Sequence, residues 1–174
     1  RAKTLPKVFE SLLKQSFKDF LWIILDDGST DNTTEVVENF QLFNPFFEII
    51  YKKDKNRHKF LTVLEGVKMV KTPYFMVVDS DDIYPEDALE TLISEVEKIE
   101  NQDNYVAVMG LSADENGKIV GNQYPNNGFD GSIFEMRYKH KVRGDKFGIF
   151  ITKTYQREIS GKDFTEYFKI YEEF

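Results

Sequence analysis

The sequence predicts an α/β fold in which a mostly parallel sheet is flanked by helices. Apolar residues at helical spacing alternate along the chain with short unbroken apolar runs, and polar turns separate the two patterns. Unbroken runs are typical of strands that helices cover on both faces. The 174 residues, 41% of them apolar, are enough for one compact domain with a core.

The first half of the chain carries the clearest signals. Apolar residues at helical spacing from Leu5 to Leu13 predict a helix, with Thr4 as its cap and Pro6 in its first turn. Apolar runs predict strands over residues 20–25, 46–51 and 74–78. Two further helices are expected between these strands, on stripes formed by Val36, Val37 and Phe40 and by Phe60, Val63, Leu64 and Val67.

The second half has looser patterns. Pro85 opens a long amphipathic helix, and residues 105–109 form a further apolar run. Turn residues are frequent over 114–131, where we expect loops and short antiparallel strands. A strand over 147–152 and a terminal helix on Phe164, Phe168 and Tyr171 complete the prediction.

Composition narrows the classes of function. The net charge of -7 and the pI near 5.0 argue against a nucleic-acid partner, because phosphate binding needs a basic face. The absence of cysteine excludes disulfides, thiolate metal sites and cysteine nucleophiles, and fits a reducing compartment. No apolar run approaches the roughly 20 residues of a membrane span. We therefore expect a soluble protein.

An acidic cluster follows the third predicted strand. The apolar run from Tyr74 to Val78 ends in Asp79, Asp81 and Asp82. Such carboxylates repel one another, and their pKa values rise unless a metal ion or a basic group lies close by. The cluster therefore predicts a site for a hard cation.

A second acidic turn, Asp26-Asp27-Gly28-Ser29-Thr30-Asp31, follows the first predicted strand. Ligands of open α/β sheets bind beyond the carboxyl ends of the strands. We treat these two strands as parallel neighbours or nearly so, which makes Asp26 and Asp27 face the same crevice as Asp79 and Asp81. The turn could instead simply cap the next helix, but the joint placement of two clusters favours a functional site.

The order and spacing of these motifs resemble a known family. Residues 25–33 read Leu-Asp-Asp-Gly-Ser-Thr-Asp-Asn-Thr, residues 78–82 read Val-Asp-Ser-Asp-Asp, and a helix starts at 87–89 with Asp-Ala-Leu. Together they resemble inverting family-two glycosyltransferases, which have the GT-A fold, a Rossmann-like sheet between helices. The resemblance weakens after Met109. It implies a nucleotide-sugar-binding half over 1–110 and a partial acceptor-side half over 111–174 of one domain, with the family's first strand missing from this sequence.

The resemblance also implies roles for the acidic residues. Asp27, with Asp26 beside it, is expected to bind the base of a nucleotide sugar, because a carboxylate can accept a hydrogen bond from a ring N–H. Asp79 is expected near the ribose and the metal, and Asp81 as the main ligand of Mn²⁺ or Mg²⁺ in the family's DXD motif. Such an ion stabilises the charge of the leaving diphosphate. Asp82 is expected to cap the next helix or to have another structural role.

The resemblance also predicts a nucleotide contact in the loop at residues 56–59 and a catalytic base near the end of the chain. The loop Asn56-Arg57-His58-Lys59 corresponds to a glycine-containing stretch of the family but lacks glycine. Contacts from Arg57 or Lys59 to the nucleotide are one interpretation, and a solvated basic loop is the other. Asp163 is the candidate catalytic base, with Glu166 in reserve, although Asp163 could instead cap the terminal helix.

The resulting prediction is an enzyme of polysaccharide biosynthesis that moves a sugar, most simply from a UDP-sugar, to a glycan or lipid-linked acceptor with inversion. A cytoplasmic location with peripheral association at the inner face of the membrane is implied by the resemblance. A magnesium-binding receiver domain of a signalling protein is one alternative, although a receiver would have no amphipathic helix before its Asp pair. A non-catalytic nucleotide-sugar-binding domain is the other.

Overall fold

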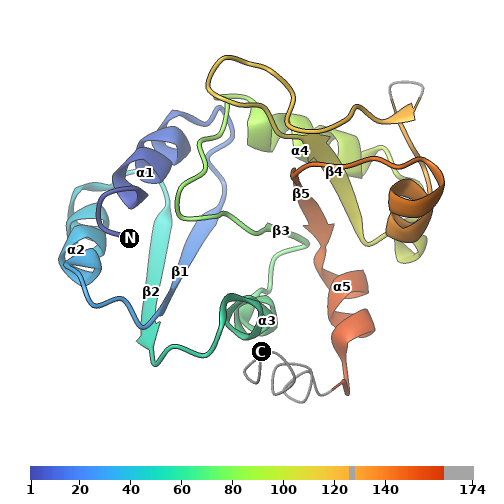
Figure 1. Cartoon of the computed structure of the whole chain (residues 1–174). Coiled ribbons are helices and arrows are strands. Elements are labelled where there is room, and N and C mark those ends of the chain that lie inside the picture. Colours follow the sequence, from blue (N-terminus) through green and yellow to red (C-terminus); the bar gives the residue numbers. More distant parts are fainter. Residues whose placement is uncertain (126–127, 163–174) are drawn as a thin grey trace, which may run out of the picture.

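The computed structural model describes residues 1–125 and 128–162 and confirms an α/β fold with a parallel pair of strands (Figure 1). Strand β1 (Leu21–Asp27) pairs in parallel with β2 (Glu48–Asp54). Helices α1 (Leu5–Lys14) and α2 (Thr33–Phe43) lie on one side of this pair, and α3 (Lys59–Met69) lies on the other. The parallel pair is thus flanked by helices on both faces.

Alternation along β1 explains this sandwich. Trp22 and Ile24 are buried in the same core as Val8 of α1 and Val37 of α2. Leu25 points to the opposite face, where its side chain lies so close to Gly66 of α3 that a Cβ there would come within 2.9 Å of Leu25 Cδ1. Successive strand residues point to opposite faces, so both faces of β1 are covered by helices.

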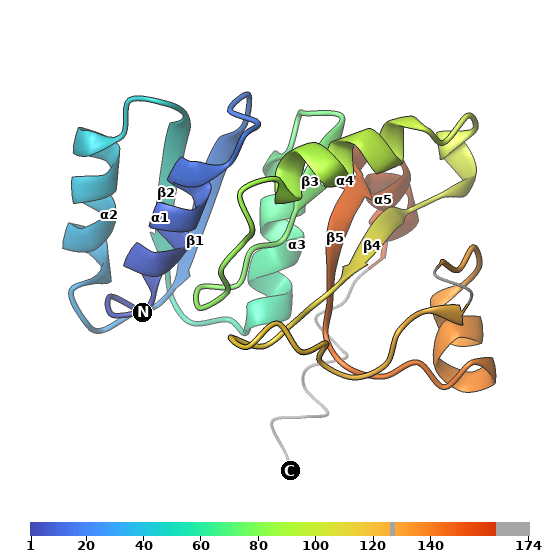
Figure 2. The same cartoon turned by 90° about the horizontal axis from the view of Figure 1, so that it is seen from above.

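A second sheet forms the other half of the molecule. Strand β5 (Lys146–Ile151) lies between β3 (Tyr74–Met76) and β4 (Ala107–Leu111) and runs antiparallel to both. The remaining elements are α4 (Ala88–Glu97), the 3₁₀ turn η1 (Gln102–Asn104), the π-helical turn η3 (Glu135–Lys139) and α5 (Thr152–Ile159). Helix α4 covers this sheet through Leu92 and Val96, which pack with Ile149 and Ile151. Figure 2 shows the two halves side by side.

The structure departs from the sequence prediction around β3. This strand ends at Met76, and the chain leaves the sheet before Val78. Strands β1 and β3 belong to separate sheets, and no strand pairing joins these sheets within the described residues, so the two strands are not parallel neighbours in one sheet. Instead, residues 78–80 and β1 line a pocket of about 100 Å³ between them.

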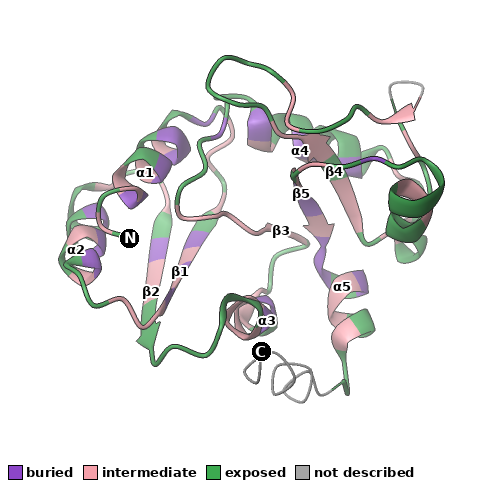
Figure 3. Ribbon diagram, in the orientation of Figure 1, coloured by how far each residue is buried: buried purple, intermediate pink, exposed green. Residues whose placement is uncertain are grey.

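Most of the buried apolar residues belong to two hydrophobic cores, one for each sheet. Buried residues lie on the inner faces of α1, α2 and α4 and on the strands, whereas the loops are mostly exposed (Figure 3). None of the helices in the described parts of the chain is long and apolar enough to cross a bilayer. The terminal helix expected around Phe164 lies outside the described residues.

Candidate functional site

The turn after β1 is held by its first acidic residue. The side chain of Asp26 is only 1% exposed, accepts hydrogen bonds from Ser29 N and Tyr51 Oη at 2.7 Å, and lies 4.0 Å from Lys53 Nζ. Burial by itself raises the pKa of Asp26, but these hydrogen bonds and the nearby ammonium outweigh it and lower the pKa. Asp26 therefore stays ionised and stabilises the turn.

Gly28 lets a second loop approach this turn closely. Its φ of +85° lies in the region that favours glycine. A Cβ on Gly28 would come within 2.8 Å of the backbone nitrogen of Asn56. The turn after β1 and the loop after β2 are thereby in backbone contact.

Asp27, the second acid of the turn, is oriented by residues around the start of α3. One oxygen of its carboxylate accepts hydrogen bonds from the backbone N–H of Arg57 at 2.8 Å and from Thr62 Oγ1 at 2.9 Å. The other oxygen accepts no hydrogen bond within the described residues. Asp27 thus has a fixed orientation and can accept a further hydrogen bond.

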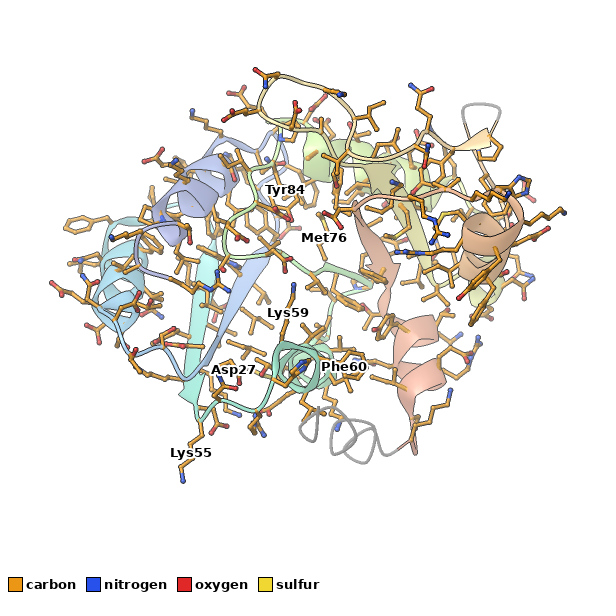
Figure 4. All side chains as sticks on the ribbon, viewed as in Figure 1. Asp27, Lys55, Lys59, Phe60, Met76 and Tyr84 are labelled. Carbon is orange, nitrogen blue, oxygen red and sulfur yellow. The ribbon has the colours of Figure 1, made fainter. Side chains whose placement is uncertain are left out.

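Lys59, the first residue of α3, reaches the acidic cluster that follows β3. Its Nζ lies 2.7 Å from each carboxylate oxygen of Asp79. In Figure 4 the side chain of Lys59 extends toward the middle of the molecule, whereas that of Lys55 points away into solvent. This position places the Lys59 ammonium at the acidic cluster, where we expected a site.

The two acidic clusters are therefore connected by residues 57–62. Arg57 and Thr62 bind Asp27, and Lys59 between them binds Asp79. This connection, and not a shared sheet, links the ends of β1 and β3. It brings one carboxylate from each cluster to the same short segment.

An ion-pair network lies next to Asp27. The guanidinium of Arg57 pairs with Glu65, and also with Asp54 at 3.2 Å, while Lys52 pairs with the same Glu65. These contacts raise the pKa of Arg57 and lower that of Glu65. Together with Asp27 these residues line a pocket of about 10 Å³, which is room for one water molecule and not for a nucleobase.

The cluster after β3 has the chemistry of a cation site. Asp81 lies 3.9 Å from a guanidinium nitrogen of Arg1. The pKa of Asp82 is raised by partial burial of its carboxyl group and by the charges of Asp79, Asp81 and Asp145. Within residues 1–125 and 128–162, no three acidic or histidine side chains converge closely enough to enclose a metal ion. Mg²⁺ and Mn²⁺ often take one or two carboxylates and fill their other positions with water and phosphate, so Asp79 and Asp81 fit such an ion.

Tyr84 was not singled out from the sequence. It is 7% exposed, its hydroxyl has no hydrogen-bond partner among the described residues, and its ring contacts that of Phe147 edge to face. Burial and the charges of Asp82 and Asp79 raise its pKa. A buried aromatic residue directly after an acidic cluster was the only signal available, and core packing explained it equally well.

The predicted catalytic base lies outside the described residues, and one contributor to the site was missed. Asp163, the candidate base, and Glu166 lie outside the described residues. The contribution of Thr62 was also missed, because a threonine in the first turn of a helix has no pattern that distinguishes it. The charge of Asp145 acts on the acidic cluster, since it contributes to the raised pKa of Asp82.

Comparison with known proteins identifies relatives. The model of the family described as "Glycosyl transferase family 2" matches residues 1–163. Glycosyltransferase GlyG of Streptococcus pneumoniae is 29% identical over 132 residues, which are 76% of this chain and 38% of GlyG. The GalNAc(5)-diNAcBac-PP-undecaprenol beta-1,3-glucosyltransferase of Campylobacter jejuni is 26% identical over 99% of this chain and 57% of its own length.

A third relative matches a shorter part. The poly-beta-1,6-N-acetyl-D-glucosamine synthase of Staphylococcus epidermidis is 30% identical over 97 residues, which are 56% of this chain and 23% of the synthase. The chain thus spans less than two thirds of the length of each of these relatives. The names of all three describe enzymes that transfer or polymerise sugars.

Proposed function

Because the chain belongs to glycosyl transferase family 2, we propose that it forms the donor-binding part of an enzyme that transfers a sugar from a nucleotide-diphosphate sugar, most simply a UDP-sugar, with inversion. The observation that carries the proposal is the link between the two acidic clusters through residues 57–62. A donor molecule has a base at one end and a charged diphosphate at the other. The two linked clusters offer partners for both.

The base is proposed to bind at Asp27. Its carboxylate is oriented by Arg57 N and Thr62 Oγ1 and can accept a further hydrogen bond from a ring N–H. Because the adjacent pocket holds only about 10 Å³, entry of a base requires the Arg57 side chain to move from its ion pairs. Asp26 supports this site indirectly, because its carboxylate stabilises the turn that carries Asp27.

The diphosphate is proposed to bind between Lys59 and the acidic cluster. Asp81, assisted by Asp79, would hold Mn²⁺ or Mg²⁺, which when bound supplies positive charge to the leaving diphosphate. The Lys59 ammonium, which neutralises Asp79 in this structure, is a second source of positive charge at the same place. The ribose is proposed to contact Asp79.

The acceptor side of the proposal rests on the relatives. The Campylobacter jejuni relative is named for transfer to an undecaprenol-linked glycan, so we propose a glycan or lipid-linked acceptor. Asp163 is the proposed base that removes the acceptor proton during inverting attack. A cytoplasmic location at the inner membrane face belongs to the same proposal.

Titration calorimetry with UDP, with and without Mn²⁺, tests the donor site. We expect Mn²⁺-dependent UDP binding that Asp81→Ala abolishes, whereas Asp27→Ala weakens nucleotide affinity and leaves Mn²⁺ binding largely unchanged. Normal UDP binding by Asp27→Ala would rule out the base contact, and unchanged Mn²⁺ affinity in Asp81→Ala would rule out the metal assignment.

A further inference from the structure

A short helical segment after β4 exposes large apolar side chains. Ile133, Phe134 and Tyr138 are 63%, 71% and 75% exposed. The rings of Phe134 and Tyr138 stack on each other, with centroids 6.3 Å apart and an interplanar angle of 14°. Exposed apolar groups that lie together in this way mark an interaction surface more often than isolated ones do.

The same segment is strongly basic. Residues 133–143 contain two arginines, two lysines and one glutamate, a formal charge of +3 in a chain whose net charge is -7. Arg137, Lys141 and Arg143 are exposed, and the glutamate is paired with Lys139 at 2.7 Å. We refer to Ile133, Phe134, Arg137, Tyr138 and Lys141 as the basic aromatic surface.

This segment is attached firmly to the body of the protein. Val142 is only 3% exposed, and its N–H donates to the carbonyl of Met136 at 3.1 Å. The ring of His140 packs edge to face on Phe129 at 4.9 Å, and Arg143 N donates to Asn122 Oδ1 at 3.2 Å. The apolar side chains are therefore exposed on an anchored segment and not on a frayed end.

The basic aromatic surface lies at one end of the molecule. In Figure 2 the orange helix that contains η3 and the blue helix α2 lie at opposite ends. Outside this segment the rest of the chain carries excess negative charge, which an anionic membrane repels. Electrostatics thus allows approach to such a membrane with this end first.

We propose that the basic aromatic surface docks the protein on an anionic lipid bilayer. Phe134, Tyr138 and Ile133 would enter the interface between headgroups and acyl chains, where aromatic rings are favoured, and Arg137 and Lys141 would bind lipid phosphates. A second copy of the chain fits less well, because a symmetric contact brings two surfaces of the same positive charge together. The proposal assigns residues to the membrane association proposed above, but it does not depend on sugar transfer.

Vesicle binding of the 174-residue chain, without donor or acceptor, tests this surface. We expect cosedimentation with phosphatidylcholine vesicles that contain about one third phosphatidylglycerol, weak binding to phosphatidylcholine alone, and loss of binding at high salt. Arg137→Gln with Lys141→Gln should weaken binding about thirtyfold. Phe134→Ser with Tyr138→Ser should weaken it at least about tenfold.

Phe43→Ser is the matched control. Phe43 is 73% exposed at the end of α2, and residues 38–46 contain no lysine or arginine. We expect this variant to bind vesicles like the parent chain, and circular dichroism should show every variant folded. The proposal would be overturned if Phe43→Ser lost as much vesicle binding as the double variant Phe134→Ser with Tyr138→Ser. It would also be overturned if the parent chain bound equally well to vesicles with and without phosphatidylglycerol. A dimer in light scattering that this double variant abolishes, while vesicle binding stays absent, would overturn it as well. Because UDP binding is measured separately, failure of either proposal leaves the other testable.

Discussion

Lys59 and Asp79 form an ion pair in which the ammonium lies 2.7 Å from both carboxylate oxygens. Lys59 begins α3, and Asp79 follows β3, so the pair connects a helix of the first half of the molecule with a loop of the second. Both side chains remain partly exposed, at 67% and 41%. A ligand can therefore reach either charge, and the pair is better suited to binding than to stability.

Removing Lys59 should affect binding more than folding. Exposed ion pairs contribute about 0 to 1 kcal/mol, so we expect Lys59→Ala to change the free energy of unfolding by less than about 1 kcal/mol. Loss of a charge beside the diphosphate should weaken UDP binding about tenfold. Urea denaturation and calorimetry measure the two effects. Lys55→Ala is the control, since Lys55 points into solvent on the preceding loop (Figure 4); equal weakening in both variants would indicate only general attraction by positive charge.

Thr62 should matter through the hydroxyl that it offers to Asp27. Thr62→Val keeps the shape of the side chain and removes the donor, so we expect a destabilisation of about 1 kcal/mol. The less firmly oriented Asp27 should bind UDP about fivefold more weakly. Thr62→Ser retains the hydroxyl and should behave like the parent chain in calorimetry. If the serine variant loses as much affinity as the valine variant, packing of the threonine methyl group is responsible.

The sequence predicted the local elements of this site better than their connection. Apolar runs with polar turns located β1 and α3, and the acidic residues after β1 and β3 were recognised from their position alone. The pairing of β3 was not predictable, because three residues of a strand carry no sign of their partner, and here the partner is β5, which follows about 70 residues later. The ion pair between Lys59 and Asp79 depends on this pairing of β3 with β5, because Asp79 follows β3.

Other features depend on contacts that sequence patterns do not encode. The sequence predicted this strand only as far as residue 51, but β2 continues to Asp54 because β1 offers hydrogen-bonding partners as far as Asp27. This extension brings Lys53 near Asp26. The left-handed backbone of His58, with φ at 80°, likewise had no signal in the residue itself.

Gly28→Ala should destabilise the protein through two separate effects. The φ of +85° costs about 1 kcal/mol for a residue with a side chain, and the added Cβ meets Asn56 N at 2.8 Å. Gly117→Ala is the control, because Gly117 has a φ of +77° and a Cβ added there would have no atom within 4 Å among the described residues. Urea denaturation should show a larger loss for Gly28→Ala than for Gly117→Ala. Equal losses of stability in the two variants would mean that the loop around Asn56 can shift to accommodate the Cβ with no energetic cost.

Asp26 and Asp82, whose pKa values are shifted in opposite directions, should give opposite pH dependence of stability. The folded-state pKa of Asp26 is lowered, so its contribution is present above the ordinary pKa of 3.8 and is lost as pH falls through the folded value. Asp26→Asn should therefore destabilise the protein at pH 7, by about 1 to 3 kcal/mol, and less in acid. The pKa of Asp82 is raised, so ionisation opposes folding as pH rises above 3.8.

Asp82→Asn should for that reason be neutral in acid and stabilising at pH 7, by less than about 1 kcal/mol because the carboxyl group is only partly buried and solvent screens its charge. Urea denaturation of both variants between pH 3 and 7 measures the two trends. A stability gain for Asp82→Asn that is the same at every pH would show that charge repulsion is not its cause.

Tyr84 carries a buried hydroxyl that has no hydrogen-bond partner within the described residues, whereas the hydroxyl of Tyr74 accepts a hydrogen bond from Gln102 Nε2 at 3.0 Å. An unpaired buried polar group costs about 1 to 3 kcal/mol, so Tyr84→Phe should leave the free energy of unfolding unchanged or raise it. Tyr74→Phe removes a made hydrogen bond and should lower it by about 1 kcal/mol. Urea denaturation of the two variants provides the comparison. The charges of Asp82 and Asp79 act on Tyr84. A Tyr84→Phe variant that is stable but binds UDP and Mn²⁺ more weakly would therefore show that the free hydroxyl serves the ligand. A variant as destabilised as Tyr74→Phe would show that the hydroxyl already has a partner in the folded protein.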